Sequence, residues 1–423
     1  MKGCALLLCV ITAAFALAAG CAPIEQGRTT PPDPYGLVNE GKALLAQGDA
    51  ARAGERFQEA LALDPALDEA RFGLVLAKAA DLVVLVDDFV DLITKQMAAG
   101  AQGSGGMTTL SDSGIGYTID HYVRLIFLPT VQVMLDQSEA LYSKPDATFT
   151  IDALPISWSG QTVLDLGGRW DHSDAVLLLA VANLLQGAFD SVLARDLDFN
   201  LGYVFALPID WNDLKNVQLQ AIWRDLVHMV IQILADPNYP NFLGLTQEGQ
   251  ARMPAAGSEF GLTAKYVTEA GWLVRQETGD QSGDVIGYVD ANANGVWDPG
   301  EPLRLPSVGV LTDAQMKALA DAALALYGVQ DSFLDGSAVD PWPDVATPLD
   351  IAVFNPLFMD LTGWDFGPIP SATVDLGGLF ARPNADPTAA KQAVVQFLTC
   401  IDQNQTPADM LRCWIALYGG TGG

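Results

Sequence analysis

Basic residues and histidine are scarce in this 423-residue chain. It holds 22 lysines and arginines against 51 aspartates and glutamates, which gives a formal net charge of −29, and it has three histidines. An acidic surface of this kind repels phosphate groups, so nucleic acid is not expected as a partner, and electrostatic docking on anionic lipid is disfavoured. The charge suits an exterior rich in divalent cations, although solubility alone also explains it.

The sequence signatures of common catalytic sites are also missing. There is no G-x-S-x-G, no H-E-x-x-H, no Walker loop and no G-x-G-x-x-G after a strand. The histidines are His121, His172 and His228, and nothing in the sequence singles out a nucleophile to act with any of them. We therefore expect that the chain is not an enzyme, with an envelope hydrolase of unfamiliar type as a further alternative.

The N-terminus carries an apolar run of a type that is removed from the mature protein. Lys2 precedes an apolar stretch over residues 5–17, which is typical of a secretory signal. The stretch ends in Ala18-Ala19-Gly20-Cys21, which resembles the bacterial lipoprotein lipobox. The resemblance implies a signal peptide over residues 1–20, acylation of Cys21 and, because Ala22 follows rather than aspartate, sorting to the outer membrane. The alternative is an ordinary secreted protein that is cleaved nearby.

Cysteines are few, and two of them are left to pair. Cys4 and Cys9 leave with the signal peptide and Cys21 is expected to carry lipid, so Cys400 and Cys413 remain. In an oxidising compartment this even pair favours a disulfide between two short C-terminal helices, with two unpaired buried thiols as the alternative. After residue 21 no stretch reaches the ~18 uncharged apolar residues of a membrane span, so a lipid anchor is the expected membrane attachment.

A helical unit is predicted to follow a short tether. Residues 21–34, which contain four prolines, are typical of a spacer. Two amphipathic segments, Tyr35–Gln47 and Ala50–Leu63, are joined at Gly48-Asp49. The spacing of their small and aromatic residues and of the proline that follows resembles a tetratricopeptide repeat (Gly41, Ala53, Phe57, Ala60 and Pro65). The predicted unit spans residues 35–99, including a long helix. The family usually binds proteins or peptides, and the alternative is a unit that only packs.

The remainder of the chain is also predicted to be mainly helical. Residues 117–280 are expected to form a helical core that contains a β-hairpin near 149–166, where Thr, Ile, Trp and Val alternate. Residues 236–261, rich in Pro, Gly and Asn, predict a long loop of the kind that is often functional. C-terminal helices and a Pro-rich wrap are expected over 312–418, and a disordered tail over 419–423. The predicted fold class is thus mainly α, a tetratricopeptide-like helical array with a small β-hairpin insertion and a calcium-loop segment at 281–311.

The calcium-loop segment contains the strongest site motif of the chain, DANANGVWDPGE. Oxygen donors stand at the positions that a calcium loop requires, with Gly295 at the sharp turn (Asp290, Asn292, Asn294, Val296, Asp298 and Glu301). The stretch resembles the EF-hand-type calcium loop, which implies Ca²⁺ as a cofactor. The strand-like entry over 285–289 and the exit through Pro299 and Pro302 favour a structural clamp over a sensor. The alternative is an Asn/Gly-rich turn between two strands.

These observations predict a lipoprotein of the bacterial cell envelope. We expect it to be anchored in the outer membrane, to act as a protein-binding or assembly module for a protein or peptide partner, and to hold structural Ca²⁺. A substrate-binding lipoprotein of an envelope transport system is the alternative, with a pocket between helices near residues 236–261.

Overall fold

The computed structural model describes residues 33–102, 114–158, 160–199, 202–205, 207, 219–279, 281, 283–305, 309–312, 391–392, 395–396 and 398–400. This part of the chain is mainly helical with a few short strands, which confirms the predicted mainly α class. The predicted signal peptide, lipidated Cys21, nearly all of the tether, most of the C-terminal wrap, Cys413 and the tail lie outside the described residues.

Three N-terminal helices begin the fold. They are α2 (Pro34–Ala46), α3 (Ala50–Leu63) and α4 (Asp68–Gln102). The Asp33 side chain accepts hydrogen bonds from the first turn of α2, and the Asp49 side chain accepts one from Arg52 N at the start of α3. The turn between α2 and α3 uses Gly48 with φ +79°, a conformation that favours glycine.

Phe57 locks these three helices together. Its side chain is fully buried, and its ring fills the space left by two glycines, Gly41 on α2 and Gly73 on α4. A Cβ atom would lie 2.7 Å from the ring at Gly41 and 2.2 Å from it at Gly73. The backbones of α2 and α4 can therefore approach Phe57 only because both positions lack a side chain.

The next helical segment changes its winding before Pro129. It consists of α5 (Gly114–Tyr122), the π-helical turn η1 (Val123–Phe127) and α6 (Leu128–Tyr142). A proline inside a helix lacks an N–H donor and its ring clashes with the carbonyl four residues earlier. The wider π turn, in which Leu128 N donates to Val123 O, accommodates Pro129 without ending the helix.

Four short strands follow in place of the single hairpin expected over 149–166. β1 (Phe149–Ile151) pairs antiparallel with β4 (Gly168–Trp170), and β2 (Pro155–Trp158) pairs antiparallel with β3 (Gln161–Asp165). The buried residues of β1, Phe149 and Ile151, alternate with an exposed threonine and join the core formed by α2–α4.

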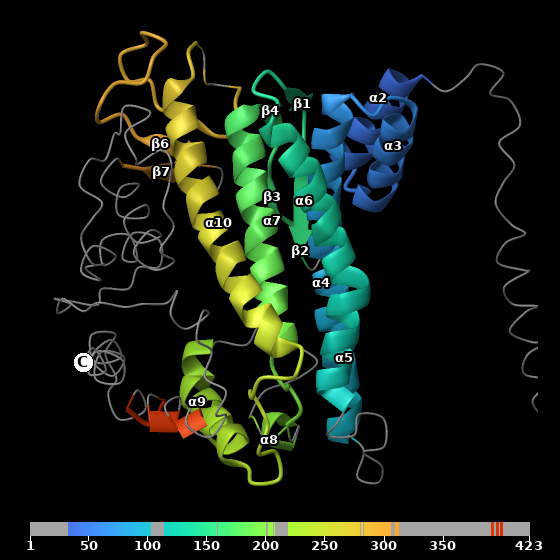
Figure 1. Cartoon of the computed structure of the whole chain (residues 1–423), viewed down its shortest axis with the longest axis vertical. Helices are drawn as coiled ribbons and strands as arrows, with labels where there is room; N and C mark the ends of the chain where they lie inside the picture. Colours follow the sequence, from blue (N-terminus) through green and yellow to red (C-terminus); the bar gives the residue numbers. More distant parts are fainter. Residues whose placement is uncertain are drawn as a thin grey trace, which may run out of the picture.

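The longer helices stand in a row (Figure 1), in which α10 packs on α7, α7 on α6, α6 on α4 and α4 on α3. α7 (His172–Leu193) begins with a capping box. The Asp171 side chain accepts from backbone N–H groups of the first turn, and the Asp174 side chain accepts from Asp171 N. By length and composition α7 would be able to cross a membrane, because an 18-residue stretch of it has a mean hydropathy of 1.8. However, 50% of that stretch is buried inside the protein. Core helices pass the same test, so the observation is weak evidence for a membrane span.

The long loop predicted over 236–261 was wrong in its second half. After α8 (Gly202–Phe205) and α9 (Leu219–Ala235), α10 begins at Gly249 and runs to Gln276 with Pro254 inside it. Packing against α7 outweighs the local proline and glycine signals, because Gly187 allows α7 to approach the Ala256 backbone so closely that a Cβ would lie 3.1 Å from its carbonyl oxygen.

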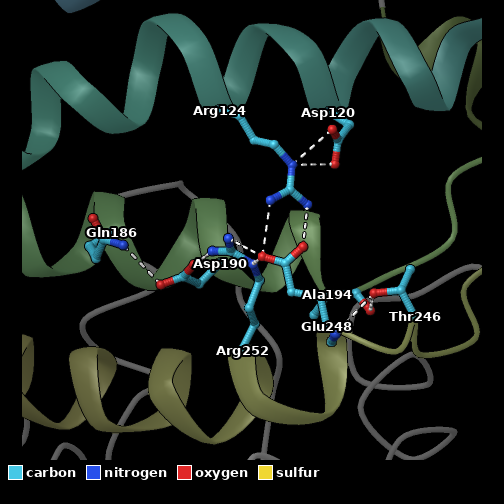
Figure 2. Close-up of polar contacts among 9 residues, drawn as sticks. Asp120, Arg124, Gln186, Asp190, Ala194, Thr246, Glu248 and Arg252 are labelled. Carbon is cyan, nitrogen blue, oxygen red and sulfur yellow. Dashed lines mark hydrogen bonds and ion pairs between the residues drawn. The ribbon is translucent and has the colours of Figure 1, made fainter.

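An ion network joins η1, the C-terminal part of α7 and the N-terminal end of α10 (Figure 2). The Arg124 guanidinium of η1 donates to both oxygens of Glu248, at 3.0 and 2.7 Å, and to Asp120. Arg252 of α10 bonds Glu248 in turn and also Asp190 of α7. Because the arginines lie between the carboxylates, the network holds η1, α7 and α10 at this end of the row.

Candidate metal centre

The predicted calcium loop joins two strands of a small sheet. β5 (Gly287–Tyr288) pairs antiparallel with β6 (Leu303–Leu305), and β6 pairs with β7 (Gly309–Leu311). The loop from Asp290 to Glu301 lies between β5 and β6, and its base is closed by a hydrogen bond from Val289 N to Pro302 O at 2.9 Å. Its twelve residues therefore begin and end at neighbouring points of one sheet.

Asp290 organises the first half of the loop. Its carboxylate accepts hydrogen bonds from Asn294 N at 3.2 Å and from Gly295 N at 2.8 Å. The chain turns back over this carboxylate through two residues in the left-handed region, Ala293 with φ 57° and Gly295 with φ 75°. Gly295 adopts this conformation without a steric penalty, whereas Ala293 is strained there.

Glu301 closes the loop from its other end. Its side chain is buried, its Oε1 accepts from Ala291 N at 2.8 Å, and its Oε2 accepts from Asp298 N at 2.9 Å. Both oxygens are therefore directed into the loop, toward backbone positions at its beginning and near its end. A glutamate placed in this way can present two oxygens to one ion.

Two asparagines meet Asp298 on the remaining side. Asn292 and Asn294 each donate a side-chain N–H to Asp298 Oδ2, at 2.6 and 2.8 Å. Their amide oxygens accept instead from the backbone N–H groups of Asn294 and Val296. Two partly positive NH₂ groups thus interact with the Asp298 carboxylate as a cation would. Each amide must rotate before its oxygen can ligate an ion.

The donor set fits a hard cation. Asp290, Asp298 and Glu301 supply carboxylate oxygens, and the asparagines supply amide oxygens once they rotate, which is the ligand chemistry of Ca²⁺. Val296 lies opposite Thr278 in an isolated antiparallel bridge. The loop residues predicted from the sequence therefore lie together.

The outside of the loop is attached to the end of α10. Gly279 N donates to Gly295 O at 2.8 Å, and Trp297 Nε1 donates to Glu301 O at 2.7 Å. The buried Arg275 guanidinium lies over the Trp297 ring, 5.0 Å from its centroid. A change in the conformation of the loop would therefore alter the surroundings of Trp297 and of the C-terminal turn of α10.

A second group of carboxylates was not predicted from the sequence. Oxygens of Asp171, Glu277 and Asp284 all lie within 4.8 Å of one another. Burial, followed by the charge of Asp171, raises the pKa of Glu277 to about 8. Burial also raises the pKa of Tyr288, and the charges of two loop residues, Asp290 and Glu301, and of Glu277 and Asp284 add to the increase. Tyr288 thus lies within electrostatic range of both acidic groups.

These carboxylates escaped the sequence analysis because they are distant along the chain. Asp171 caps α7, Glu277 caps the end of α10, and Asp284 precedes β5. The local pattern at Asp171 indicates only a helix start, and no spacing rule links it to residues more than a hundred positions later.

The other candidate residues are dispersed or lie outside the described part of the chain. Cys400 is disulfide-bonded, while its predicted partner Cys413 and the predicted lipidation site Cys21 lie outside the described residues. His121, His172 and His228 lie on three different helices, α5, α7 and α9. Burial lowers the pKa of His172, against an opposing effect of Asp171.

Comparisons of the chain with protein-family models, with curated proteins and with solved structures found no match.

Proposed function

We propose that this chain is a lipid-anchored protein of the bacterial cell envelope that binds a protein or peptide partner and holds a structural Ca²⁺ in the loop Asp290–Glu301. The observation that carries the proposal is the gathering of Asp290, Asp298 and Glu301 around one short loop. Extracytoplasmic calcium modules bind at about 10⁻⁴–10⁻³ M, an affinity that keeps a loop filled only outside the cytoplasm. The lipobox-like sequence ending at Cys21 favours the same compartment.

A cation would stabilise the connection between β5 and β6. Three carboxylates within twelve residues repel one another, and the asparagine NH₂ groups offset this repulsion only partly. Bound Ca²⁺ supplies two positive charges to these oxygens. Because Glu301 already bonds both Ala291 N and Asp298 N, the loop keeps its course and only the amides need to turn.

Two features support the partner-binding role. The α2–α4 unit resembles a tetratricopeptide repeat, whose family usually binds proteins or peptides. In addition, Tyr117, His121 and Leu125 follow one another at intervals of four residues on α5 and η1, all exposed, with Tyr117 at 69% and Leu125 at 62%. The Tyr117 and His121 rings stack at 5.8 Å. Such a row of exposed aromatic and aliphatic side chains suits a protein partner.

Crosslinking in cells of the organism that makes this protein tests the partner role. A photo-crosslinking amino acid at Tyr117 and, separately, at Leu125 should give the same discrete protein adduct. The control position is Val163 on β3, which is 60% exposed and lies outside the α2–α4 unit. The proposal is contradicted if positions 117 and 125 give no adduct beyond the pattern seen at 163. In the same cells Cys21→Ser should release the protein from the membrane fraction.

A cavity favours the second candidate function, that of a substrate-binding lipoprotein. Its volume is about 520 Å³, within the range of small-molecule sites, and it lies beside residues 236–240. The lining residues come from α9, from the turn after it and from the C-terminal helical residues (Leu234, Ala235, Asp236, Pro240, Lys391, Gln392, Val395 and Gln396). Lys391 Nζ bonds the Tyr239 and Pro240 carbonyls at 2.7 and 3.0 Å.

Native mass spectrometry of protein purified from host cells separates this candidate from the first. A transport function predicts a co-purified small molecule that is lost in Val395→Trp, which fills the cavity, and kept in Val163→Trp on the exposed face of β3. If wild-type protein carries no small molecule, or if Val395→Trp retains it, the cavity is not the substrate site.

A further inference from the structure

The carboxylates of Asp171, Glu277 and Asp284 meet where three parts of the chain converge. Asp171 stands between β4 and α7, Glu277 follows α10, and Asp284 lies in the segment that runs along β4. Two hydrogen bonds fix that segment, from Arg169 N to Gly283 O at 2.7 Å and from Val285 N to Arg169 O at 3.0 Å. The three carboxylates are therefore positioned by backbone pairing and by helix ends.

A fourth carboxylate, Asp174, is fully buried beside them. Its Oδ2 accepts from Asp171 N at 2.9 Å, and its Oδ1 is buried with no hydrogen-bond partner. Burial raises the pKa of Asp174 well above its usual range, and the charges of Asp171, Glu277 and Asp284 raise it further. The Asp174 carboxyl thus interacts with each of the other three.

Helix capping accounts for only part of this arrangement. Asp171 and Asp174 form the capping box of α7, which uses one oxygen of Asp174 and satisfies N–H groups of the first turn. Capping does not account for the second Asp174 oxygen, nor for Glu277 at the C-terminal end of α10, where the helix dipole disfavours an anion. Glu277 Oε2 is likewise buried without a hydrogen-bond partner.

One cation near the group is a protein side chain. Arg169 Nη1 lies 3.7 Å from Asp284 Oδ1, but the Arg169 side chain is 51% exposed. A half-exposed guanidinium at that distance only weakly offsets the charge of this group, in which Asp174 and Asp284 are buried and Asp171 and Glu277 are partly buried. Buried carboxylates that are not paired must otherwise take up protons or coordinate a metal.

From these contacts we propose that Asp171, Asp174, Glu277 and Asp284 form a second, buried cation site, specific for Ca²⁺. All its donors are carboxylate oxygens, which select a hard cation over zinc or copper. Ca²⁺ accepts several protein oxygens in irregular geometry, whereas Mg²⁺ keeps several of its waters and requires octahedral geometry that a buried group of carboxylates does not offer. A bound ion here would tie α7, α10 and the segment before β5 together.

Calcium titration calorimetry of the full chain in detergent tests this site separately from the loop. Wild-type protein should bind two Ca²⁺ per chain, Asp290→Ala one, Glu277→Gln one, and the double variant none. Glu277→Gln should weaken Ca²⁺ binding at the buried site by about 10-fold or more, because it removes one ligand charge. The matched control is Glu259→Gln, the same change at a half-buried position of α10 about 27 Å along the helix from Glu277.

Folding of the variants is not expected to confuse the result. Glu277→Gln keeps the side-chain size and removes one of four like charges, so in EDTA it should melt at or above the wild-type temperature. Asp174→Asn provides a second variant with the same expectation for Ca²⁺ stoichiometry. The buried site is refuted if Glu277→Gln and Asp174→Asn bind as many Ca²⁺ as wild type, which would mean that the carboxyls hold protons. If the loop alone fails, wild type binds one Ca²⁺ that Glu277→Gln loses and Asp290→Ala keeps.

Discussion

Replacing Gly73 by alanine should destabilise the N-terminal helices despite the higher helix propensity of alanine. At an open helix position this change adds about 1 kcal/mol to stability. At Gly73 the new Cβ would lie 2.2 Å from the Phe57 ring, more than 1 Å inside normal contact. Phe57 cannot easily withdraw, because it is fully buried and its ring meets that of Phe149 at 6.2 Å. Overpacking of this kind costs about 1–3 kcal/mol, and so large an overlap belongs at the upper end. We therefore expect a net loss of about 2 kcal/mol.

Gly54 provides the matched control on α3. A Cβ at Gly54 would lie 3.7 Å from its nearest neighbour, the Ala77 side chain, which is ordinary contact. Gly54→Ala should therefore raise the stability by about 0.5–1 kcal/mol. Since the two substitutions are chemically identical and both fall inside helices, the difference of about 3 kcal/mol between them isolates the contact with Phe57.

Urea denaturation followed by circular dichroism measures the free energy of unfolding, and hydrogen exchange of peptides from α2–α4 shows where stability is lost. Adding Phe57→Leu to Gly73→Ala should recover part of the loss, since the smaller side chain leaves room for the new methyl group. The packing described for α2–α4 is refuted if Gly73→Ala is as stable as Gly54→Ala. It is also refuted if the losses of stability caused by Phe57→Leu and Gly73→Ala are additive in the double variant.

Three further predictions concern charge and covalent structure. The Arg124 hydrogen bonds lower the pKa of Glu248 to about 2, so the contribution of Glu248 to stability is present above pH ~4.5 and is lost as the pH falls toward 2. Because the Glu248 side chain is 46% exposed, Glu248→Gln should cost only about 1 kcal/mol at neutral pH in urea melts, with no difference at pH ~2. An equal effect of Glu59→Gln would contradict the network. The raised pKa of Glu277, about 8, means that the ion-free protein should lose stability as the pH rises from about 4.5 to about 8; melting in EDTA should show this fall, and an identical fall in Glu277→Gln would disprove its origin. Peptide mapping without reductant should find Cys400 linked to Cys413, and recovery of a free Cys413 thiol would rule out that pairing.

Local sequence signals predicted the helices whose ends they mark. Asp49 and Gly48 mark the junction of α2 and α3, and the expected segments match these helices to within one residue. Local signals misled at α10, where Pro254 and nearby glycines favour a loop, but packing on α7 keeps the chain helical. Propensity is a weak prior of at most a few kcal/mol over such a segment, and tertiary contacts can outweigh it.

The candidate sites differ in the same way. The calcium-loop motif is contained in twelve consecutive residues, so the sequence alone places its carboxylates together. The buried group requires β4, α10 and the segment before β5 to converge, which depends on pairing between Arg169 and residues 283–285. Only tertiary structure brings Asp171 and Asp174 to Glu277 and Asp284.

The Trp297 indole N–H offers the most direct measurement of calcium in the loop, because it donates to Glu301 O at 2.7 Å and its ring lies under Arg275. In ¹⁵N-tryptophan spectra, with the signal assigned by Trp297→Phe, addition of Ca²⁺ should shift this resonance and saturate with a Kd of about 10⁻⁴–10⁻³ M. Asp290→Ala should abolish the shift, while Asp91→Ala at an exposed position of α4 should leave it intact. A Trp297 resonance that stays in place at ~10 mM Ca²⁺, in folded wild-type protein, would contradict calcium binding by this loop.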